Sequence, residues 1–455
     1  MGPKDDRQTP QHDLFRMELA NLINPRHPLV QLAERIDWSV FEQKWAGFFT
    51  STTGRPAAPP RLIAGLLYLQ HAYNLSDEAV LERWLESPYF QYFCGEQYFQ
   101  HELPIDPSSM TRWRKRIGEE GVEELLAQTI ETARREGLVK RQSLERITVD
   151  TTVQEKAITY PTDAKLYARA IRNLGKEARR HGIPLRQSFA RKAPETLLQV
   201  NRYAKAKQMK RKRRATRQLK TYLGRLTRDI ERKLVDAPES AATALRPQLR
   251  KARQLLEQTR KDPDKLLAWH APEVEVIGKG KVAKPWEFGV KVSVAVTNRE
   301  SFVVGCRTMP NRPYDGHTLN EALEQAEILS GGVRPTHCYV DRGYKGALGL
   351  PRMKVFHSGQ RRGVDTRRLR RELRRRSAVE AVIGHMKTDG RMDRCRLKGR
   401  LGDAMNAVLA AAGHNIRLLL RAMPALLRAL LGWLLSRLGG HRAALGAPEP
   451  AGVPV

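Results

Sequence analysis

Apolar and polar residues alternate along several short stretches of the chain, and this period predicts β-strands. The clearest case is Trp286–Thr297, where valines alternate with small or polar residues. After a short turn, residues 301–309 are expected to return as its antiparallel partner. Residues 146–153 and 336–341 show the same alternation, and 351–357 is a candidate for a further strand. The pattern therefore predicts a sheet assembled from segments far apart in the sequence.

Elsewhere apolar residues recur every three or four positions, which predicts amphipathic helices. Residues 1–140 are interpreted as all helical, and a late basic helix is predicted over 374–387. Within the first region, a helix over 106–118 carries the cations Arg112 and Arg114. Short helices joined by tight turns are typical of a helix-turn-helix domain that binds duplex DNA. A helical packing module with one basic surface fits the same pattern equally well.

Residues 165–261 combine helical periodicity with charge of one sign. This segment holds 29 Lys or Arg and 7 Asp or Glu. Leu219, Leu223 and Leu226 keep helical spacing inside it, so a folded helix with a basic outside is predicted, because a charged tail would lack that stripe. The densest run consists of Lys210, Arg211, Lys212, Arg213 and Arg214. Most charged runs are solvated surface, but an excess of this size favours contact with the DNA backbone.

The charge of the whole chain supports a polyanionic partner. The formal net charge of +32 destabilises a soluble chain by self-repulsion unless nucleic acid or another polyanion neutralises it. A membrane partner is not favoured, because the sequence has no long uncharged apolar stretch and its start is polar, without a signal peptide. The four cysteines are widely spaced and are interpreted as reduced thiols. We expect a cytoplasmic, nucleoid-associated protein of two or three domains.

Three acidic residues occupy unusual positions. Asp150 lies within a β-branched strand, Asp341 ends another strand, and Glu380 shares one face of the late basic helix with Arg376 and Lys387. Taken singly, each has an ordinary explanation as a cap or a helix salt bridge. Taken together, they can converge at one end of a mixed sheet, and clustered carboxylates suit Mg²⁺ or Mn²⁺. Two such ions roughly 3.5–4 Å apart support phosphoryl transfer.

Several segments also carry recognisable motifs. They are VDTTVQEKAITYPTDAKL, EFGVKVSVAVT, PYDGHTL, VDRGYKG, RRRSAVEAVIGHMK and GDAMNAVLAAAGHNIRLLL. These motifs resemble those of bacterial insertion-sequence DDE transposases of the insertion-sequence-five family. The family signature Y-x2-R-x3-E-x6-K is met by Arg376, Glu380 and Lys387, but Leu373 stands in place of the tyrosine. A second signature, an Asp followed by Gly, Tyr and a basic residue, is met by Asp341, Gly343, Tyr344 and Lys345.

The resemblance implies an α/β architecture with a ribonuclease H-like catalytic core. We assign this core to residues 141–160 and 280–422, interrupted by a basic helical insertion over 161–279. An all-helical N-terminal DNA-binding domain over 1–140 precedes the core, and a C-terminal helix with a disordered tail over 423–455 follows it. Disorder is expected over 439–455, which are rich in Gly, Ala and Pro.

The resemblance also implies an activity. Asp150, Asp341 and Glu380 are expected to bind two Mg²⁺ or Mn²⁺ ions, to cleave DNA at terminal inverted repeats and to join the 3′ ends to target DNA. Tyr344 and Lys345 are expected to contact DNA. The same is expected of the cations Arg112, Arg114, Lys210, Arg211, Lys212, Arg213, Arg214, Arg376 and Lys387. A homodimer is expected in the synaptic complex. A metal-dependent nuclease without strand transfer and an inactive DNA-binding relic are the alternatives. The presence of all three acids argues against the relic.

Overall fold

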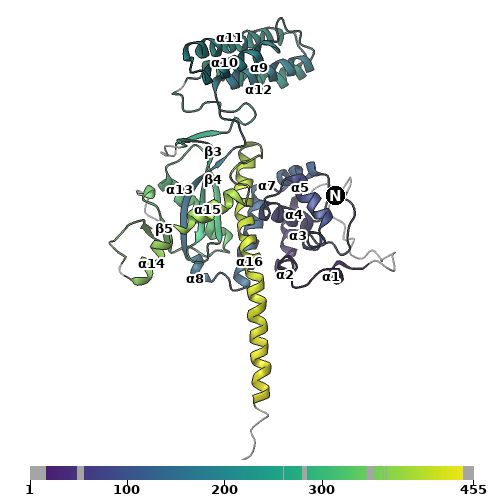
Figure 1. Cartoon of the computed structure of the whole chain (residues 1–455), viewed down its shortest axis with the longest axis vertical. Coiled ribbons are helices and arrows are strands. Elements are labelled where there is room, and N and C mark those ends of the chain that lie inside the picture. The colour runs from purple at the N-terminus through teal and green to yellow at the C-terminus, as the bar shows by residue number, and fades with distance from the viewer. Residues whose placement is uncertain are drawn as a thin grey trace, which may run out of the picture.

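The computed structural model describes residues 17–48, 56–259, 261–278, 284–345, 353–361, 363–364 and 366–443. The long helix α16 (Gly399–Ala443) lies between a group of N-terminal helices and a β-sheet with helices beside it (Figure 1). A bundle of four helices, α9 to α12, projects beyond one end of the sheet (Figure 1). The architecture is therefore mixed α/β, with the bundle inserted between two strands of the sheet.

The described residues of the N-terminal part form helices joined by loops, with one isolated β-bridge between Glu18 and Tyr98. Some of its helices begin at side-chain caps; for example, the hydroxyl of Ser76 accepts the Ala79 backbone N–H at 3.1 Å. Gly118 has a φ of 63° and divides the longest of these helices, where the sequence predicts a helix end. The elements are α1 (Leu19–Leu22), α2 (Pro28–Arg35), α3 (Ser39–Trp45), η2 (Ala46–Phe48), α4 (Pro60–Ala72), α5 (Asp77–Glu86), α6 (Pro88–Phe93), α7 (Pro107–Arg135) and α8 (Arg141–Leu144).

In the described residues the sheet has six strands, with β1 (Arg146–Glu155) at its centre. β1 runs antiparallel to β3 (Trp286–Thr297) and parallel to β5 (His337–Val340). β4 (Val303–Met309) pairs with β3, and β6 (Lys354–His357) pairs with β5. These strands confirm the predictions from alternation. One strand was not predicted: β2 (Glu275–Gly278) lies within the range assigned to the insertion but pairs with β3.

The insertion is a four-helix bundle with its own hydrophobic core. It consists of α9 (Asp163–Arg180), α10 (Lys192–Lys205), α11 (Met209–Lys233) and α12 (Glu239–Glu257). The predicted stripe of Leu219, Leu223 and Leu226 is fully buried in this core, which is separate from the main one. The cations are left on the outside, as amphipathic patterning requires.

The C-terminal third contains α13 (Asp315–Leu329), η3 (Arg342–Tyr344), α14 (Arg367–Arg375), α15 (Ala378–Thr388) and α16. The prediction of one continuous helix over 374–387 is wrong, because α14 ends at Arg375 and α15 begins at Ala378. The helix α16 continues to Ala443, so residues 439–443 are helical where disorder was predicted, and 444–455 lie outside the described residues. Within the described part of the chain, no helix is both long and apolar enough to cross a membrane.

Candidate active site

The sheet brings two of the three predicted acids side by side on neighbouring strands. Asp150 lies in the middle of β1, and Asp341 directly follows the neighbouring parallel strand β5. In that pair Thr148 lies opposite Tyr339, so continuing the register by two residues places Asp150 beside Asp341. The carboxylate of Asp341 also caps η3 by accepting the Arg342 backbone N–H at 2.6 Å. Both acids are therefore positioned by backbone structure.

Helix α15 supplies the third acid. Val379, Val382, Ile383 and Met386 are buried and pack this helix against the core, next to β1. Glu380 lies in the first turn of the helix, where the helix dipole favours a negative charge. Its side chain is 67% exposed, so it is open to solvent above the sheet edge.

Arg376 links the three carboxylates. Its Nη2 atom donates to Asp150 Oδ2 at 2.8 Å and lies 3.9 Å from Asp341 Oδ2, and its Nη1 atom lies 3.4 Å from Glu380 Oε1. The residue is only 9% exposed and lies at the break between α14 and α15. The sequence predicts that Arg376 meets a DNA phosphate, whereas the structure pairs it with the predicted acids.

The electrostatics of Asp150 follow from this arrangement. Burial raises the pKa of the Asp150 carboxyl, while Arg376 and the Thr151 backbone N–H lower it. The neighbouring acids Asp341 and Glu380 raise the pKa again, since like charges disfavour ionisation. The net shift is upward, so the ionised form of Asp150 depends on a nearby positive charge.

The donor set suits a hard divalent cation, because all three side chains offer carboxylate oxygens. As the side chains stand, however, no three Asp, Glu, His or Cys residues of the described chain are close enough together to coordinate an ion. The guanidinium of Arg376 lies among the carboxylates in the position that a cation would take. Binding an ion there requires Arg376 to release at least part of the cluster.

A further acid, Asp315 at the start of α13, contacts β1 at the residue after Asp150. Its Oδ1 atom accepts hydrogen bonds from Thr151 Oγ1 and from Lys291 Nζ, both at 2.9 Å. The sequence analysis did not assign Asp315 a role, although it lies in the PYDGHTL motif. Because Thr151 is adjacent to Asp150, this contact joins α13 to the strand that carries the predicted catalytic acid.

Two of the predicted DNA contacts are buried instead. Tyr344 is 1% exposed, and its ring belongs to the main core. Arg114 is 2% exposed and pairs with Asp77 of α5. Both predictions of direct DNA contact are therefore corrected: neither side chain reaches a surface, because helix packing covers them. Leu373, at the signature tyrosine position, packs against the small cluster of Tyr339, Phe356 and Val364.

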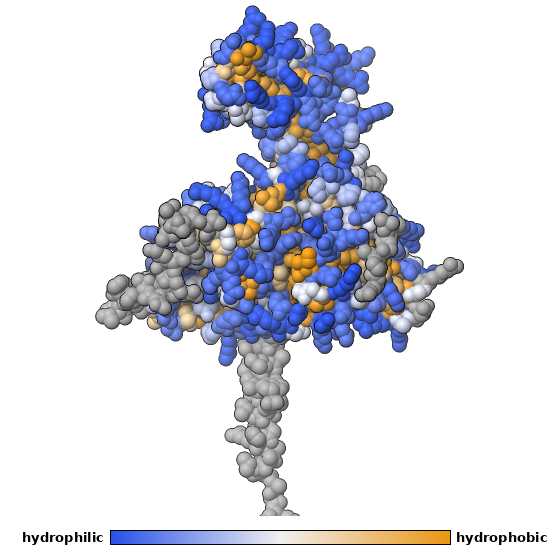
Figure 2. All heavy atoms as spheres, turned by 180° about the vertical axis from the view of Figure 1, so that it is seen from behind, coloured by the Kyte–Doolittle hydropathy of each residue, from blue (hydrophilic) through white to orange (hydrophobic). Residues whose placement is uncertain are grey.

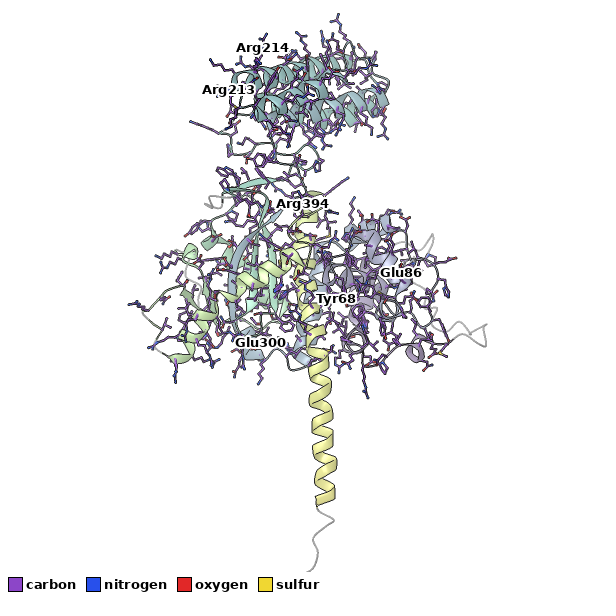
Figure 3. All side chains as sticks on the ribbon, in the orientation of Figure 1. Tyr68, Glu86, Arg213, Arg214, Glu300 and Arg394 are labelled. Atoms are coloured by element: carbon purple, nitrogen blue, oxygen red, sulfur yellow. The ribbon has the colours of Figure 1, made fainter. Side chains whose placement is uncertain are left out.

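The other predicted DNA contacts lie at or near the surface. Lys345 and Arg112 are exposed, and Lys387 is half-buried on α15. Lys210, Arg211, Arg213 and Arg214 are exposed on α11, with Lys212 partly covered. Figure 3 shows Arg213 and Arg214 projecting from the far side of the insertion bundle. Contact between these residues and DNA stays a prediction.

Comparisons with known proteins identify two transposase domain families in the chain. Residues 17–116 match the family described as Transposase domain (DUF772), and residues 257–416 match the Transposase DDE domain family. The chain is also 52% identical over 198 residues to a protein of Rhizobium meliloti named "Uncharacterized protein ORF8 in nfe locus". That alignment covers 44% of this chain and 95% of the relative. No solved structure matches the chain.

Proposed function

We propose that this chain, whose residues 257–416 match the Transposase DDE domain family, is a metal-dependent DDE transposase that mobilises an insertion sequence of the insertion-sequence-five family. In this proposal it binds the terminal inverted repeats of the element and cleaves phosphodiester bonds at their ends. It then joins the 3′ ends to target DNA on a ribonuclease H-like core, the fold that the matched domain implies.

One observation carries the assignment of the catalytic residues. Asp150, Asp341 and Glu380 come from β1, the end of β5 and α15, yet all three contact the same guanidinium. An ordinary helix salt bridge would join only Arg376 and Glu380, and it would not explain why two acids from the sheet contact the same guanidinium. Three acids around one cation are the arrangement that a cation-dependent phosphoryl transfer needs.

When bound, two Mg²⁺ or Mn²⁺ ions would activate the attacking oxygen and stabilise the leaving oxygen of the phosphodiester. Asp150, Asp341 and Glu380 are the residues that would hold them. Asp150 anchors the site because its strand is fixed on both sides by neighbouring strands. Glu380 lies at the exposed side, where the DNA strand would enter.

Cations around the site are assigned to DNA binding. Lys345 follows Asp341 by four residues, Lys387 lies on the same helix as Glu380, and Lys210–Arg214 lie on the insertion bundle. We propose that they contact phosphates of the element end and of the target, and that two copies of the chain act together in the synaptic complex. Phosphate contacts of this kind position the duplex without reading its sequence.

Substitution of the acids tests the proposal. Asp150→Asn, Asp341→Asn and Glu380→Gln should each reduce cleavage of end DNA to background while leaving binding of the same DNA within about twofold, because they remove ion ligands and no phosphate contact. Glu324→Gln on α13 is a matched control, since Glu324 is exposed and outside the cluster. Cleavage by any of the three variants at the wild-type rate contradicts the site. Cleavage by the wild-type protein without joined products supports the nuclease alternative.

A further inference from the structure

A hollow of about 500 Å³ lies where the insertion bundle joins the rest of the chain. Its walls are α9, the start of α10 and the two connecting segments at 158–161 and 267–270. Figure 2 shows apolar surface on the bundle and at this junction, amid a mostly hydrophilic exterior. The apolar residues of the lining, here called the floor, include Pro194, Leu197 and Trp269. It is thus an apolar groove on the most basic part of the protein.

A row of cations borders this groove. Arg169, Arg172, Lys176 and Arg179 all line it, and their spacing of three, four and three residues places them on one face of α9. All four are exposed, and their side chains make no ion pair or hydrogen bond with the described residues. No acidic residue lines the groove. The rim is therefore complementary to a regularly spaced row of negative charges.

The groove lies near the candidate active site along the chain. Its first lining residue, Ile158, follows Asp150 by eight residues, most of them in β1. At about 3.3 Å per extended residue, the near edge lies within roughly 26 Å of the Asp150 backbone. A strand of DNA that enters the active site can reach the groove within several nucleotides.

We propose that this groove binds unpaired nucleotides of the DNA end, with phosphates on the α9 cations and a base on the apolar floor. The inference rests on the proposed function, which makes DNA the substrate. Paired DNA presents phosphates and groove edges outward and keeps its base faces stacked, so a duplex would leave the floor uncovered. Unpaired strands offer both features, since basic grooves track the backbone while bases pack on apolar or aromatic side chains.

Binding of a short fluorescein-labelled oligothymidylate to the full-length chain, measured by anisotropy without metal, tests this assignment. Leu197→Gln should weaken binding about tenfold, the size expected for losing one base contact, and should leave a duplex of the same length within about twofold. Leu198→Gln is the matched control, because Leu198 is the adjacent residue of α10, is 51% exposed and does not line the groove. Equal loss for oligothymidylate and duplex, or no loss, would overturn the proposal.

The rim is tested separately. Arg172→Gln with Lys176→Gln should reduce the log–log salt slope for oligothymidylate by about 1.4, given about 0.7 per phosphate of a single strand. Arg180→Gln is the control, since Arg180 lies on α9 outside the groove. A synthetic amphipathic helix of leucine and glutamate serves as a competitor. If this helix binds through Leu197 more tightly than oligothymidylate does and displaces it, the groove belongs to a protein partner and the nucleotide proposal is wrong.

The two proposals fail in different ways. Asp150→Asn should not change oligothymidylate binding, because Asp150 does not line the groove. A chain that cleaves end DNA but shows no Leu197-dependent oligothymidylate binding keeps the transposase function and loses the groove. A chain that binds oligothymidylate through Leu197 but never cleaves keeps the groove and loses the function.

Discussion

At the scale of single residues, Arg376 has the most consequential environment. A planar guanidinium carries five N–H donors, and two of its nitrogens are directed at the acids of three different elements. The positive charge offsets the repulsion among three carboxylates that the fold brings together. The same contacts oppose metal binding, because the ions and the guanidinium require the same oxygens.

Removal of this charge gives a direct prediction. Arg376→Gln should increase the affinity of the DNA-free protein for Mn²⁺ about tenfold, because one competitor worth about 1.4 kcal/mol is lost. The measurement is the free Mn²⁺ signal in electron paramagnetic resonance titrations of the wild-type protein and the variant at the same pH. Arg375→Gln is the control, since Arg375 donates to the Asn298 carbonyl and does not touch the acids. Weaker Mn²⁺ binding in Arg376→Gln would show that the arginine orients the ligands instead.

The sequence identifies the three acids of the candidate site, but it does not predict which side chains contact them. Residue type and position on strands or a helix are enough to single out Asp150, Asp341 and Glu380. The inward direction of Arg376 does not follow from helical spacing, because i,i+4 spacing specifies only a shared face. The burial of Arg114 and Tyr344 depends on helices distant in sequence, as does the contact of Asp315 with Thr151. Tertiary packing decides these cases, and one sequence contains no direct signal for it.

At the scale of elements, dependence on tertiary packing also explains why β2 was not predicted while the other strands were. The strands β1, β3, β4 and β5 are visible as alternating runs, whereas β2 has four residues and is defined by its pairing with β3. The break between α14 and α15 is also invisible in the sequence, because it contains neither glycine nor proline and both linking residues stay near helical angles. Packing of neighbouring segments therefore sets such boundaries.

The contact between α4 and α16 joins the N-terminal helices to the catalytic part and is sensitive to a single methyl group. A Cβ atom at Gly413 would lie 2.6 Å from the backbone carbonyl carbon of His71, closer than the backbone can accommodate. Gly413→Ala should therefore lower the free energy of unfolding by about 1–3 kcal/mol through overpacking. Urea unfolding followed by tryptophan fluorescence is the measurement, because four of the seven tryptophans lie in the N-terminal helices.

The matched control is Gly384→Ala on α15, where a Cβ would meet nothing within 4 Å. This substitution should raise the free energy of unfolding by up to about 1 kcal/mol, because alanine favours the helix more than glycine does. Opposite signs for the two glycines support close packing of α4 on α16. A stability for Gly413→Ala equal to that of the wild type would mean that the two helices move apart at little cost.

At the scale of the whole molecule, charge is distributed unevenly. The insertion bundle contains about two thirds of the net excess, since residues 165–261 hold 29 basic and 7 acidic residues of a chain with a formal charge of +32. This division can be predicted from composition alone. The leucine stripe also predicts a folded helix in this segment, and the structure buries that stripe in the core of the four-helix bundle.

The charge of the bundle gives the last prediction. If residues 210–214 contact duplex end DNA, replacing all five by Gln should reduce the log–log salt slope of binding by up to about 4.5, because each neutralised phosphate contributes about 0.9. Exchanging each Lys for Arg and each Arg for Lys in the same run is the control, since it preserves charge and should preserve the slope. Anisotropy of labelled end DNA across a salt series measures both variants. If the five-Gln variant keeps the wild-type slope, residues 210–214 do not contact the duplex and α11 presents a solvated surface.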